Sequence, residues 1–270
     1  MDSIDEKIEE RKEFCIEVAR SGAETALNSF RSNFSAETKE FETDFVTEAD
    51  ITVQRQILDQ IQRHYSDDTL VGEEENIQKT VPKSGVSWIV DPIDGTTNFL
   101  HGSRLWATCV ALTVDGSGAG GAIVAPALND TYLVRNGSSY RNGSPLNVSD
   151  KADLVTYSVA PILQWTTERD DEFRTELIAV VENFGDLRRI GSAQMTLARV
   201  ATGAIDVAFS TISVPNPWDT VIGVLLVRQA GGRVTDIYGN EWTPESTGII
   251  ATNGHNHEAV IECIRDCSQK

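Results

Sequence analysis

The 270-residue sequence is poor in lysine relative to its acidic content. It has 23 Lys and Arg against 41 Asp and Glu, which gives a formal net charge of −18. A field this negative repels nucleic acid and anionic lipid, so we expect neither as a partner. The lysines are Lys7, Lys12, Lys39, Lys79, Lys83, Lys151 and Lys270.

The acidic excess has two interpretations. One is a moderately acidic cytosolic protein. The other, which we favour, is adaptation to molar salt, which would point to a haloarchaeal source. In molar salt the self-repulsion of a carboxylate-rich, lysine-poor surface is screened.

Long apolar runs are also missing. No run reaches the ~20 residues that a membrane helix needs, and residues 1–6 are acidic, unlike the start of a signal peptide. We therefore expect a cytoplasmic protein without a membrane partner. The length and composition are those of an ordinary globular chain with one or two domains.

The cysteines are too few for a disulfide framework in a chain of this length. They are Cys15, Cys109, Cys263 and Cys267. The last two, with His255 and His257, could be interpreted as a zinc site. Structural zinc sites carry more tightly spaced cysteine pairs, so we expect core or half-exposed cysteines instead.

Apolar spacing predicts two helices in the first part of the chain. They cover residues 2–34, with a break near Gly22, and 47–65, where Thr47 and Asp50 fit a capping box. Short apolar runs separated by Gly- and Asn-rich turns then predict an antiparallel meander. These runs are 69–71, 86–90, 107–114, 121–124 and 131–134.

The pattern changes after residue 148. Strand-like runs now alternate with helix-like ones, which predicts a sheet covered by crossover helices. The strand-like runs are 154–159 and 205–209, and the helix-like ones are 172–184, 194–202 and 219–230. We place a domain boundary here, with residues 1–146 in one domain and 147–270 in the other.

The segment 88–102 carries the densest chemistry. A predicted buried strand ends at two carboxylates three residues apart, Asp91 and Asp94, and Gly95-Thr96-Thr97 follow directly. Carboxylates suit hard divalent cations, and exposed N–H groups and hydroxyls suit a phosphate. Either aspartate alone would fit an ordinary Asx-Gly surface turn.

Two further acidic segments match this pattern. Gly72-Glu73-Glu74 follows another predicted strand, and Trp218-Asp219 opens an apolar helix. Taken alone, the glutamates fit a solvated charge run and Asp219 fits an N-cap.

Together the segments resemble the inositol monophosphatase family of lithium-sensitive, magnesium-dependent phosphatases. The motifs occur in the family's order and span nearly the whole chain. They are 46–50, 72–74, 88–98, 141–146, 190–193 and 218–219 with 230–232.

The resemblance implies an α/β (α+β) fold, the two-domain layered α-β-α-β-α sandwich of inositol monophosphatase and fructose-1,6-bisphosphatase. Asp219 lies in the second half of the chain, and the other expected metal ligands lie in the first. The metal site should therefore sit between the halves.

The resemblance also implies two or three Mg²⁺ ions. Their ligands would be Glu73, Asp91, Asp94, Asp219 and the backbone carbonyl of Ile93. The N–H groups of Gly95 and Thr96, with the side chains of Thr96 and Thr97, would bind the phosphate. A water activated by the metal ions would attack without a covalent intermediate, aided by Glu73 and by Thr96 hydrogen-bonded to Asp50.

The expected substrate contacts depart from the family pattern. Between residues 206 and 218 the family has a glutamate that binds inositol hydroxyls, and this chain has no carboxylate there. Ser210 or Asn216 could replace that contact, and Gly191, Ser192 and Ala193 could line the leaving-group side. Lys39 lies where the family places a basic residue near the metals, although a solvated lysine fits equally. We assign His101 no chemistry and expect it to pack or hydrogen-bond.

The function implied is Mg²⁺-dependent hydrolysis of a small phosphate monoester of a polyol or sugar, inositol-1-phosphate first. The alternative within the same chemistry is fructose-1,6-bisphosphatase or a dual-specificity sugar phosphatase. An alternative of another class is a non-catalytic regulatory relative, against which the intact metal carboxylates argue. The family also implies a homodimer.

Overall fold

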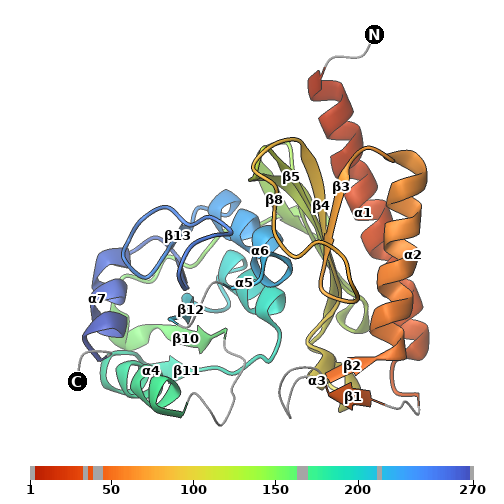
Figure 1. Ribbon diagram of the computed structural model, residues 1–270. Helices are drawn as coiled ribbons and strands as arrows, with labels where there is room; N and C mark the ends of the chain where they lie inside the picture. Colours follow the sequence, from red (N-terminus) through yellow and green to blue (C-terminus); the bar gives the residue numbers. More distant parts are fainter. Residues whose placement is uncertain (1–3, 33–35, 39–44, 163–169, 212–214, 268–270) are drawn as a thin grey trace.

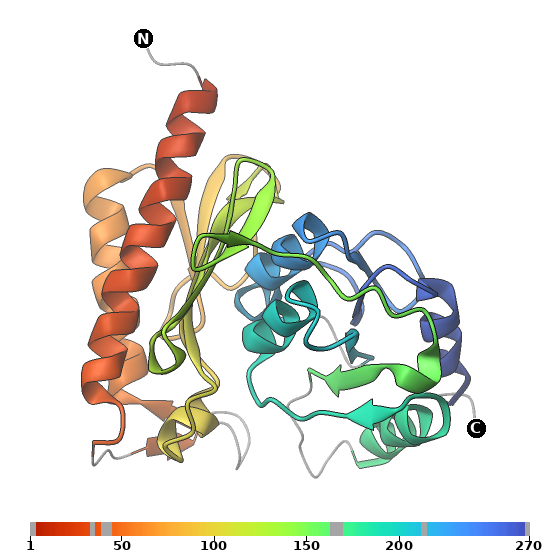
Figure 2. The same cartoon turned by 180° about the vertical axis from the view of Figure 1, so that it is seen from behind.

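Helical and sheet layers alternate through the protein, which we describe from a computed structural model that covers residues 4–32, 36–38, 45–162, 170–211 and 215–267. Helices α1 (Ile4–Ser29) and α2 (Glu48–His64) cover one face of a seven-stranded sheet. Helices α5 (Ala193–Ala201) and α6 (Pro217–Gln229) lie between that sheet and a second, five-stranded one. Helices α4 (Asp170–Asn183) and α7 (His257–Cys267) cover the outer face of the second sheet (Figures 1 and 2).

The seven-stranded sheet contains the predicted antiparallel meander, but the prediction is wrong for the run 69–71. That run forms β3, which pairs with β4 in parallel because the connection 73–85 returns the chain to the end of the sheet where β3 began. The order of the sheet is β3-β4-β5-β6-β7-β8-β9, in which β3 pairs with β4 in parallel and the remaining pairs are antiparallel. The strands are β3 (Thr69–Gly72), β4 (Val86–Asp94), β5 (Ala107–Val114), β6 (Ser117–Ala125), β7 (Asp130–Arg135), β8 (Ser138–Arg141) and β9 (Ser144–Pro145).

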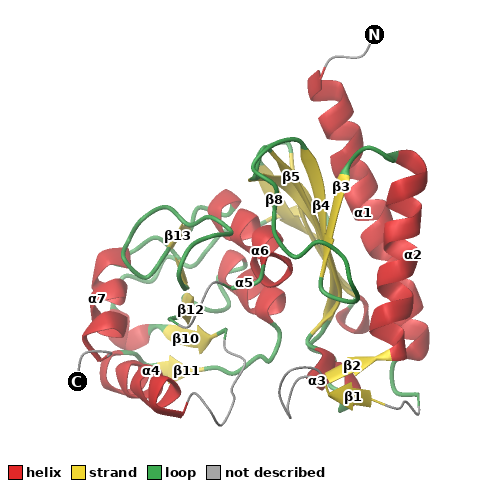
Figure 3. Ribbon diagram, viewed as in Figure 1, coloured by secondary structure: helices red, strands yellow, loops and turns green. Residues whose placement is uncertain are grey.

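The five-stranded sheet is mixed and has the order β11-β10-β12-β14-β13. Its parallel part comes from strands joined by crossover helices, as the alternation after residue 148 predicts. The strands are β10 (Ser158–Pro161), β11 (Asp186–Leu187), β12 (Val207–Ser210), β13 (Arg233–Thr235) and β14 (Ile249–Thr252). The predicted layered sandwich is confirmed (Figure 3). The boundary at 146/147 falls between the two sheets, and the division into domains there stays a prediction.

Smaller elements complete the description. Strand β1 (Ala36–Thr38) pairs antiparallel with β2 (Phe45–Thr47), a pairing that the apolar pattern did not predict. Helix α3 (Thr96–Leu100) follows β4, and two 3₁₀ turns lie at Pro126–Leu128 and Leu154–Thr156. The strand predicted from residue 154 is wrong in its first half, because Asp153 caps that 3₁₀ turn and β10 begins only at Ser158.

The predicted helix break at Gly22 is wrong, since α1 runs through it. A Cβ atom at Gly22 would lie 2.6 Å from Cδ1 of Ile57 on α2. The glycine therefore permits close packing of the two helices rather than ending one of them. The predicted capping box is confirmed, with the Thr47 hydroxyl and the Asp50 carboxylate each bonding the other's backbone N–H.

Three apolar clusters hold the layers together. One joins α1 and α2 to the large sheet, one fills the space around α5 and α6 between the sheets, and one lies under α4 and α7. The described helices include none that is both long and apolar enough to span a bilayer.

Within the described residues, the alternative zinc site is not formed. His257 is fully buried, and its two ring nitrogens lie 2.8 Å from the hydroxyls of Thr235 and Thr252. Burial lowers its pKa to about 4, so the ring is neutral. Cys15 and Cys109 are buried and Cys263 is half-buried, as expected; the Cys267 side chain lies outside the described part.

Candidate metal centre

The alternation of side chains along β4 directs Asp91 toward the second half of the chain. Trp88 and Val90 belong to the apolar cluster beneath α1 and α2, whereas Ile89 belongs to the cluster around α5 and α6. Successive strand residues point to opposite faces, so Asp91 points to the same side as Ile89.

A bulge at the end of β4 brings Asp94 to the side of Asp91. Residues three apart on a regular strand would point to opposite faces. The pairing with β5 shifts between Asp91, which is opposite Cys109, and Asp94, which is opposite Ala107. Proline lacks an N–H, which suits Pro92 to the irregular stretch, and its carbonyl accepts from Thr108 Oγ1 at 2.8 Å.

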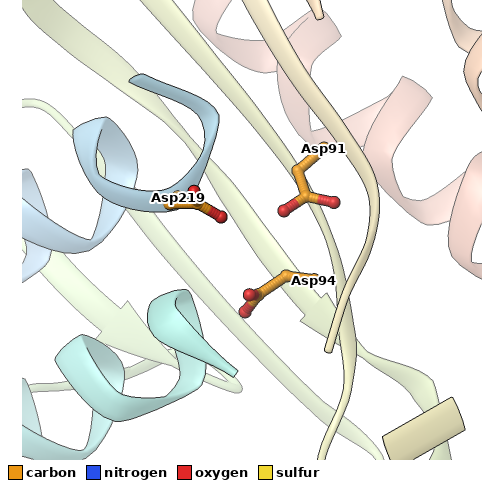
Figure 4. A group of neighbouring side chains, drawn as sticks. All are labelled: Asp91, Asp94 and Asp219. Atoms are coloured by element: carbon orange, nitrogen blue, oxygen red, sulfur yellow. The ribbon is translucent and has the colours of Figure 1, made fainter. Parts of the chain in front are cut away.

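Helix α6 supplies the third carboxylate from the far side. Asn216 is the N-cap and Pro217 the first helical residue, so Asp219 lies in the first turn and is not itself the cap. The Asn216 side chain donates to Asp219 Oδ2 at 3.0 Å. Figure 4 shows the carboxylates of Asp91, Asp94 and Asp219 turned toward one another, and one oxygen from each lies within 4.8 Å of the others.

Asp91 is buried among other negative charges. It is 1% exposed, and neither carboxylate oxygen has a hydrogen-bond donor among the described residues. Burial, followed by the negative charges of Glu73, Asp94 and Asp219, raises the pKa of Asp91 well above its usual range. A buried carboxylate without donors needs a cation or a proton.

Asp94 is held by the N-terminus of α5. Its carboxylate accepts from the backbone N–H groups of Ala193 at 2.9 Å and Gln194 at 3.0 Å, and from the hydroxyl of Ser192. Burial raises the pKa of Asp94 to about 6, and these hydrogen bonds limit the rise. Burial, followed by the negative charges of the cluster, also raises the pKa of the Cys109 thiol, which is therefore unreactive.

Glu73 lies beside the cluster rather than within it. It follows β3, and its backbone N–H donates to Val90 O on β4 at 3.3 Å. Its oxygens are not part of the group of three. Among the neighbouring carboxylates, however, Glu73 raises the pKa of Asp91 the most.

The residues expected to bind phosphate follow β4 directly. Gly95 has φ +93° and precedes α3, a conformation that glycine adopts without strain. Thr96 Oγ1 lies 3.2 Å from both Asp50 Oδ1 and Ile93 O. Thr97 is exposed. The turn at Gly95 and the hydroxyl of Thr96 thus lie next to the carboxylates.

Of the predicted substrate contacts, Ser192 and Ala193 lie against the carboxylate cluster. Gly191 (φ +76°) precedes Ser192 and Ala193, which both donate to Asp94. Ser210 ends β12 and is buried. Lys39 lies outside the described residues.

His101 is exposed, and its Nδ1 lies 2.9 Å from Thr97 O. It therefore forms a local hydrogen bond, as expected, and has no place in the carboxylate group.

Two residues that the motifs did not single out join the segments of the site. Lys79 Nζ donates to Glu73 O at 2.6 Å and lies 5.4 Å from the ring centre of Trp218. Asn98 Nδ2 lies 2.7 Å from Leu105 O and 2.9 Å from Ile190 O, which ties α3 to the loop before α5. The contacts with Trp218 and Ile190 leave no signal in local sequence spacing, because these partners are distant in the chain.

The donor set fits a hard divalent cation. Every candidate ligand is a carboxylate or carbonyl oxygen, and Asp91 has two buried oxygens without donors. Oxygen-only sites with shared carboxylates suit Mg²⁺. Asp91, Asp94 and Asp219 can therefore hold such an ion.

Comparisons with known proteins identify similar chains. The model of the inositol monophosphatase family matches residues 7–269. A fructose-1,6-bisphosphatase/inositol-1-monophosphatase of Thermotoga maritima is 32% identical over 95% of this chain and 96% of its own length. The inositol-1-monophosphatase of Bacillus subtilis is 31% identical over 90% of this chain and 92% of its own.

Solved structures show the same fold. A Thermotoga maritima IMPase aligns with a TM-score of 0.86 at 30% identity, over 96% of this chain and 98% of that one. The extragenic suppressor protein suhB of Bartonella henselae aligns with a TM-score of 0.85 at 26% identity, over 94% of this chain and 97% of that one.

Proposed function

The chain belongs to the inositol monophosphatase family of Mg²⁺-dependent phosphatases, and from this premise we propose that it hydrolyses inositol-1-phosphate. The observation that carries the proposal is the buried Asp91 carboxylate, which lacks donors and faces Asp94 and Asp219. A phosphatase of this family needs such a cluster for its cations.

The cation ligands would be the side chains of Asp91, Asp94, Asp219 and Glu73 and the carbonyl of Ile93, which together could hold two or three ions. Bound Mg²⁺ would offset the charge of the phosphoryl oxygens and of the leaving alkoxide and would acidify the attacking water. The backbone N–H groups of Gly95 and Thr96, with the Thr97 hydroxyl, would hold the phosphate oxygens so that the phosphorus–leaving-group bond is in line with that water.

Thr96 and Asp50 would manage the proton of the attacking water. Asp50 is fully buried, and its Oδ2 is taken by the backbone N–H of Thr47 at 2.9 Å. Its Oδ1 lies 3.2 Å from Thr96 Oγ1. When the Thr96 hydroxyl donates to Asp50, its lone pairs can accept a hydrogen bond from the water, and the proton can pass through Oγ1 to Oδ1.

A second substrate is favoured by one feature of the loop before α6. Residues 207–218 contain no carboxylate. Inositol hydroxyls would therefore hydrogen-bond there with neutral groups such as Ser210 and Asn216. The Thermotoga relative is named for both fructose-1,6-bisphosphate and inositol-1-phosphate hydrolysis. The second candidate is therefore fructose-1,6-bisphosphatase activity at the same site.

The test is phosphate release with MgCl₂ at high KCl from inositol-1-phosphate and from fructose-1,6-bisphosphate. Asp219→Asn is the inactive control. A wide margin for inositol-1-phosphate supports the first candidate, and equal rates or a margin for the bisphosphate support the second. No Mg²⁺-dependent release from either substrate contradicts the proposal and favours a regulatory role. A homodimer and a cytoplasmic location complete the proposal.

A further inference from the structure

Two buried glutamines bind backbone on both sides of the metal centre. Gln54 on α2 is 0% exposed and Gln194 on α5 is 1% exposed. In each, the amide oxygen accepts from a backbone N–H and the amide nitrogen donates to a backbone carbonyl. A buried amide satisfied at both ends fixes the position of the chain that it contacts.

Gln54 holds the residue that follows Glu73. Its Oε1 accepts from the N–H of Glu74 at 2.8 Å, and its Nε2 donates to the carbonyl of the same residue at 2.7 Å. A Cβ atom at Gly72 would lie 2.8 Å from Gln54 Oε1, so the glycine makes room for the amide. Glu73 stands between these two contacts.

Gln194 holds the helix that carries Asp219. Its Oε1 accepts from the N–H of Gly223 at 2.8 Å, and its Nε2 donates to Trp218 O at 2.5 Å. These two groups lie on either side of Asp219 in α6. A Cβ atom at Gly223 would lie 2.6 Å from Cβ of Leu197 and 2.7 Å from Gln194 Oε1, so this glycine makes room for both side chains.

The backbone of Gln194 connects this contact to the first half of the chain. Its N–H donates to Asp94 Oδ2 at 3.0 Å, while its side chain bonds α6. One residue therefore sets the separation between Asp94 and the first turn of α6, from which Asp219 projects.

The four carboxylates differ in what fixes them. Asp91 and Asp94 are carried by β4, where they lie opposite Cys109 and Ala107 of β5. Glu73 and Asp219 come from a loop and from a helix start, and like charges push these segments away from β4. A neutral amide can hold these segments against the repulsion without competing with the cation, whereas a lysine or arginine would pair with the carboxylates themselves.

We propose that Gln54 and Gln194 are positioning residues that hold Glu73 and Asp219 at the separation from Asp91 and Asp94 that a divalent cation requires. The proposal rests on the proposed function, because it takes these carboxylates as ligands. Neither glutamine touches the cation or the substrate; each acts through the backbone next to one ligand.

The test compares Gln54→Met and Gln194→Met with wild type. Methionine keeps the length and volume of glutamine and removes both hydrogen bonds. Titration with MgCl₂ alone, followed by calorimetry, should show a dissociation constant raised about 10- to 100-fold in each variant, as expected when an outer contact of a metal ligand is lost. The Mg²⁺ concentration for half-maximal activity should rise equally, with kcat at saturating Mg²⁺ within about threefold of wild type.

Gln56→Met is the matched control. Gln56 lies two residues from Gln54 on α2, and its amide also bonds at both ends, to Ser21 and Thr25 on α1. The melting temperature of all variants in EDTA reports the purely structural cost. If Gln56→Met lowers that temperature as much as the other two and leaves Mg²⁺ affinity unchanged, weaker binding in the other two comes from positioning.

Two results would overturn the inference. One is Mg²⁺ affinity within twofold of wild type in folded Gln54→Met and Gln194→Met. The other is an equal loss of affinity in Gln56→Met. Where a methionine variant does not fold, the asparagine variant replaces it with the same expectation, because its amide is one methylene too short to reach both backbone groups. Absence of Mg²⁺ binding by wild type would instead contradict the proposed function.

Discussion

The Thr96 hydroxyl lies 3.2 Å from Asp50 Oδ1 and so joins the turn after β4 to the first turn of α2. The other oxygen of Asp50 closes the capping box with Thr47. The cap of a helix therefore also orients the hydroxyl next to the carboxylate cluster. A substitution of Asp50 would therefore disturb both the helix cap and the hydroxyl, whereas a substitution of Thr96 tests the hydroxyl alone.

Thr96→Val should lower kcat about 10²- to 10⁴-fold, the range for loss of a group that handles a proton. Valine keeps the shape of threonine and removes the hydroxyl, so folding should be retained. Thr96→Ser should keep most of the activity. The measurement is steady-state phosphate release at saturating Mg²⁺, and equal rates for the valine and serine variants would remove the hydroxyl from the mechanism.

Asp91→Asn should stabilise the metal-free protein and abolish Mg²⁺ binding. The pKa of Asp91 is raised in the fold, so wild type loses stability as pH rises above the ordinary range of an aspartate. The variant lacks this loss, and its advantage in EDTA should therefore grow as pH rises from 5 to 8.

The check on Asp91→Asn is the melting temperature in EDTA from pH 5 to pH 8, compared with wild type at each pH. His257, whose pKa is lowered to about 4, changes stability in the opposite direction over part of this range. It acts equally in both proteins and cancels in the difference. A variant less stable than wild type at pH 8 would contradict the electrostatic account.

Mg²⁺ binding should release protons near pH 6. Asp94 has a pKa of about 6 and that of Asp91 is also raised, so part of the cluster is protonated there in the metal-free protein. A cation binds only the ionised form, and its affinity should therefore weaken as pH falls through about 6. Calorimetry in two buffers of different ionisation enthalpy measures the released protons, and identical heats at pH 6 would argue against raised pKa values.

The protein should be more stable in 2 M KCl than in 50 mM KCl. The net charge of −18 favours unfolding by self-repulsion, which molar salt screens. A gain of about 2 kcal/mol would raise the melting temperature by roughly 4–8 °C in a chain of this size. Equal melting temperatures at the two concentrations would contradict salt adaptation and support the interpretation as a moderately acidic protein.

Local sequence patterns predicted much of the fold because they depend on neighbouring residues. The expected strand 107–114 has the bounds of β5, and the capping box of Thr47 and Asp50 is present as predicted. The pattern failed at Gly22, where the glycine serves packing against Ile57 and the helix continues. A partner 35 residues away cannot be seen in local spacing.

The sequence by itself determined which side chains are candidates for the chemistry: the carboxylates and the Gly-Thr-Thr turn, in the order of the motifs along the chain. Only the tertiary structure decided how they meet. A bulge turns Asp94 to the side of Asp91, the N-terminus of α5 holds it there, and two buried amides bond the backbone next to Glu73 and around Asp219. These contacts join segments that are remote in the chain, so their geometry arises only when the layers pack.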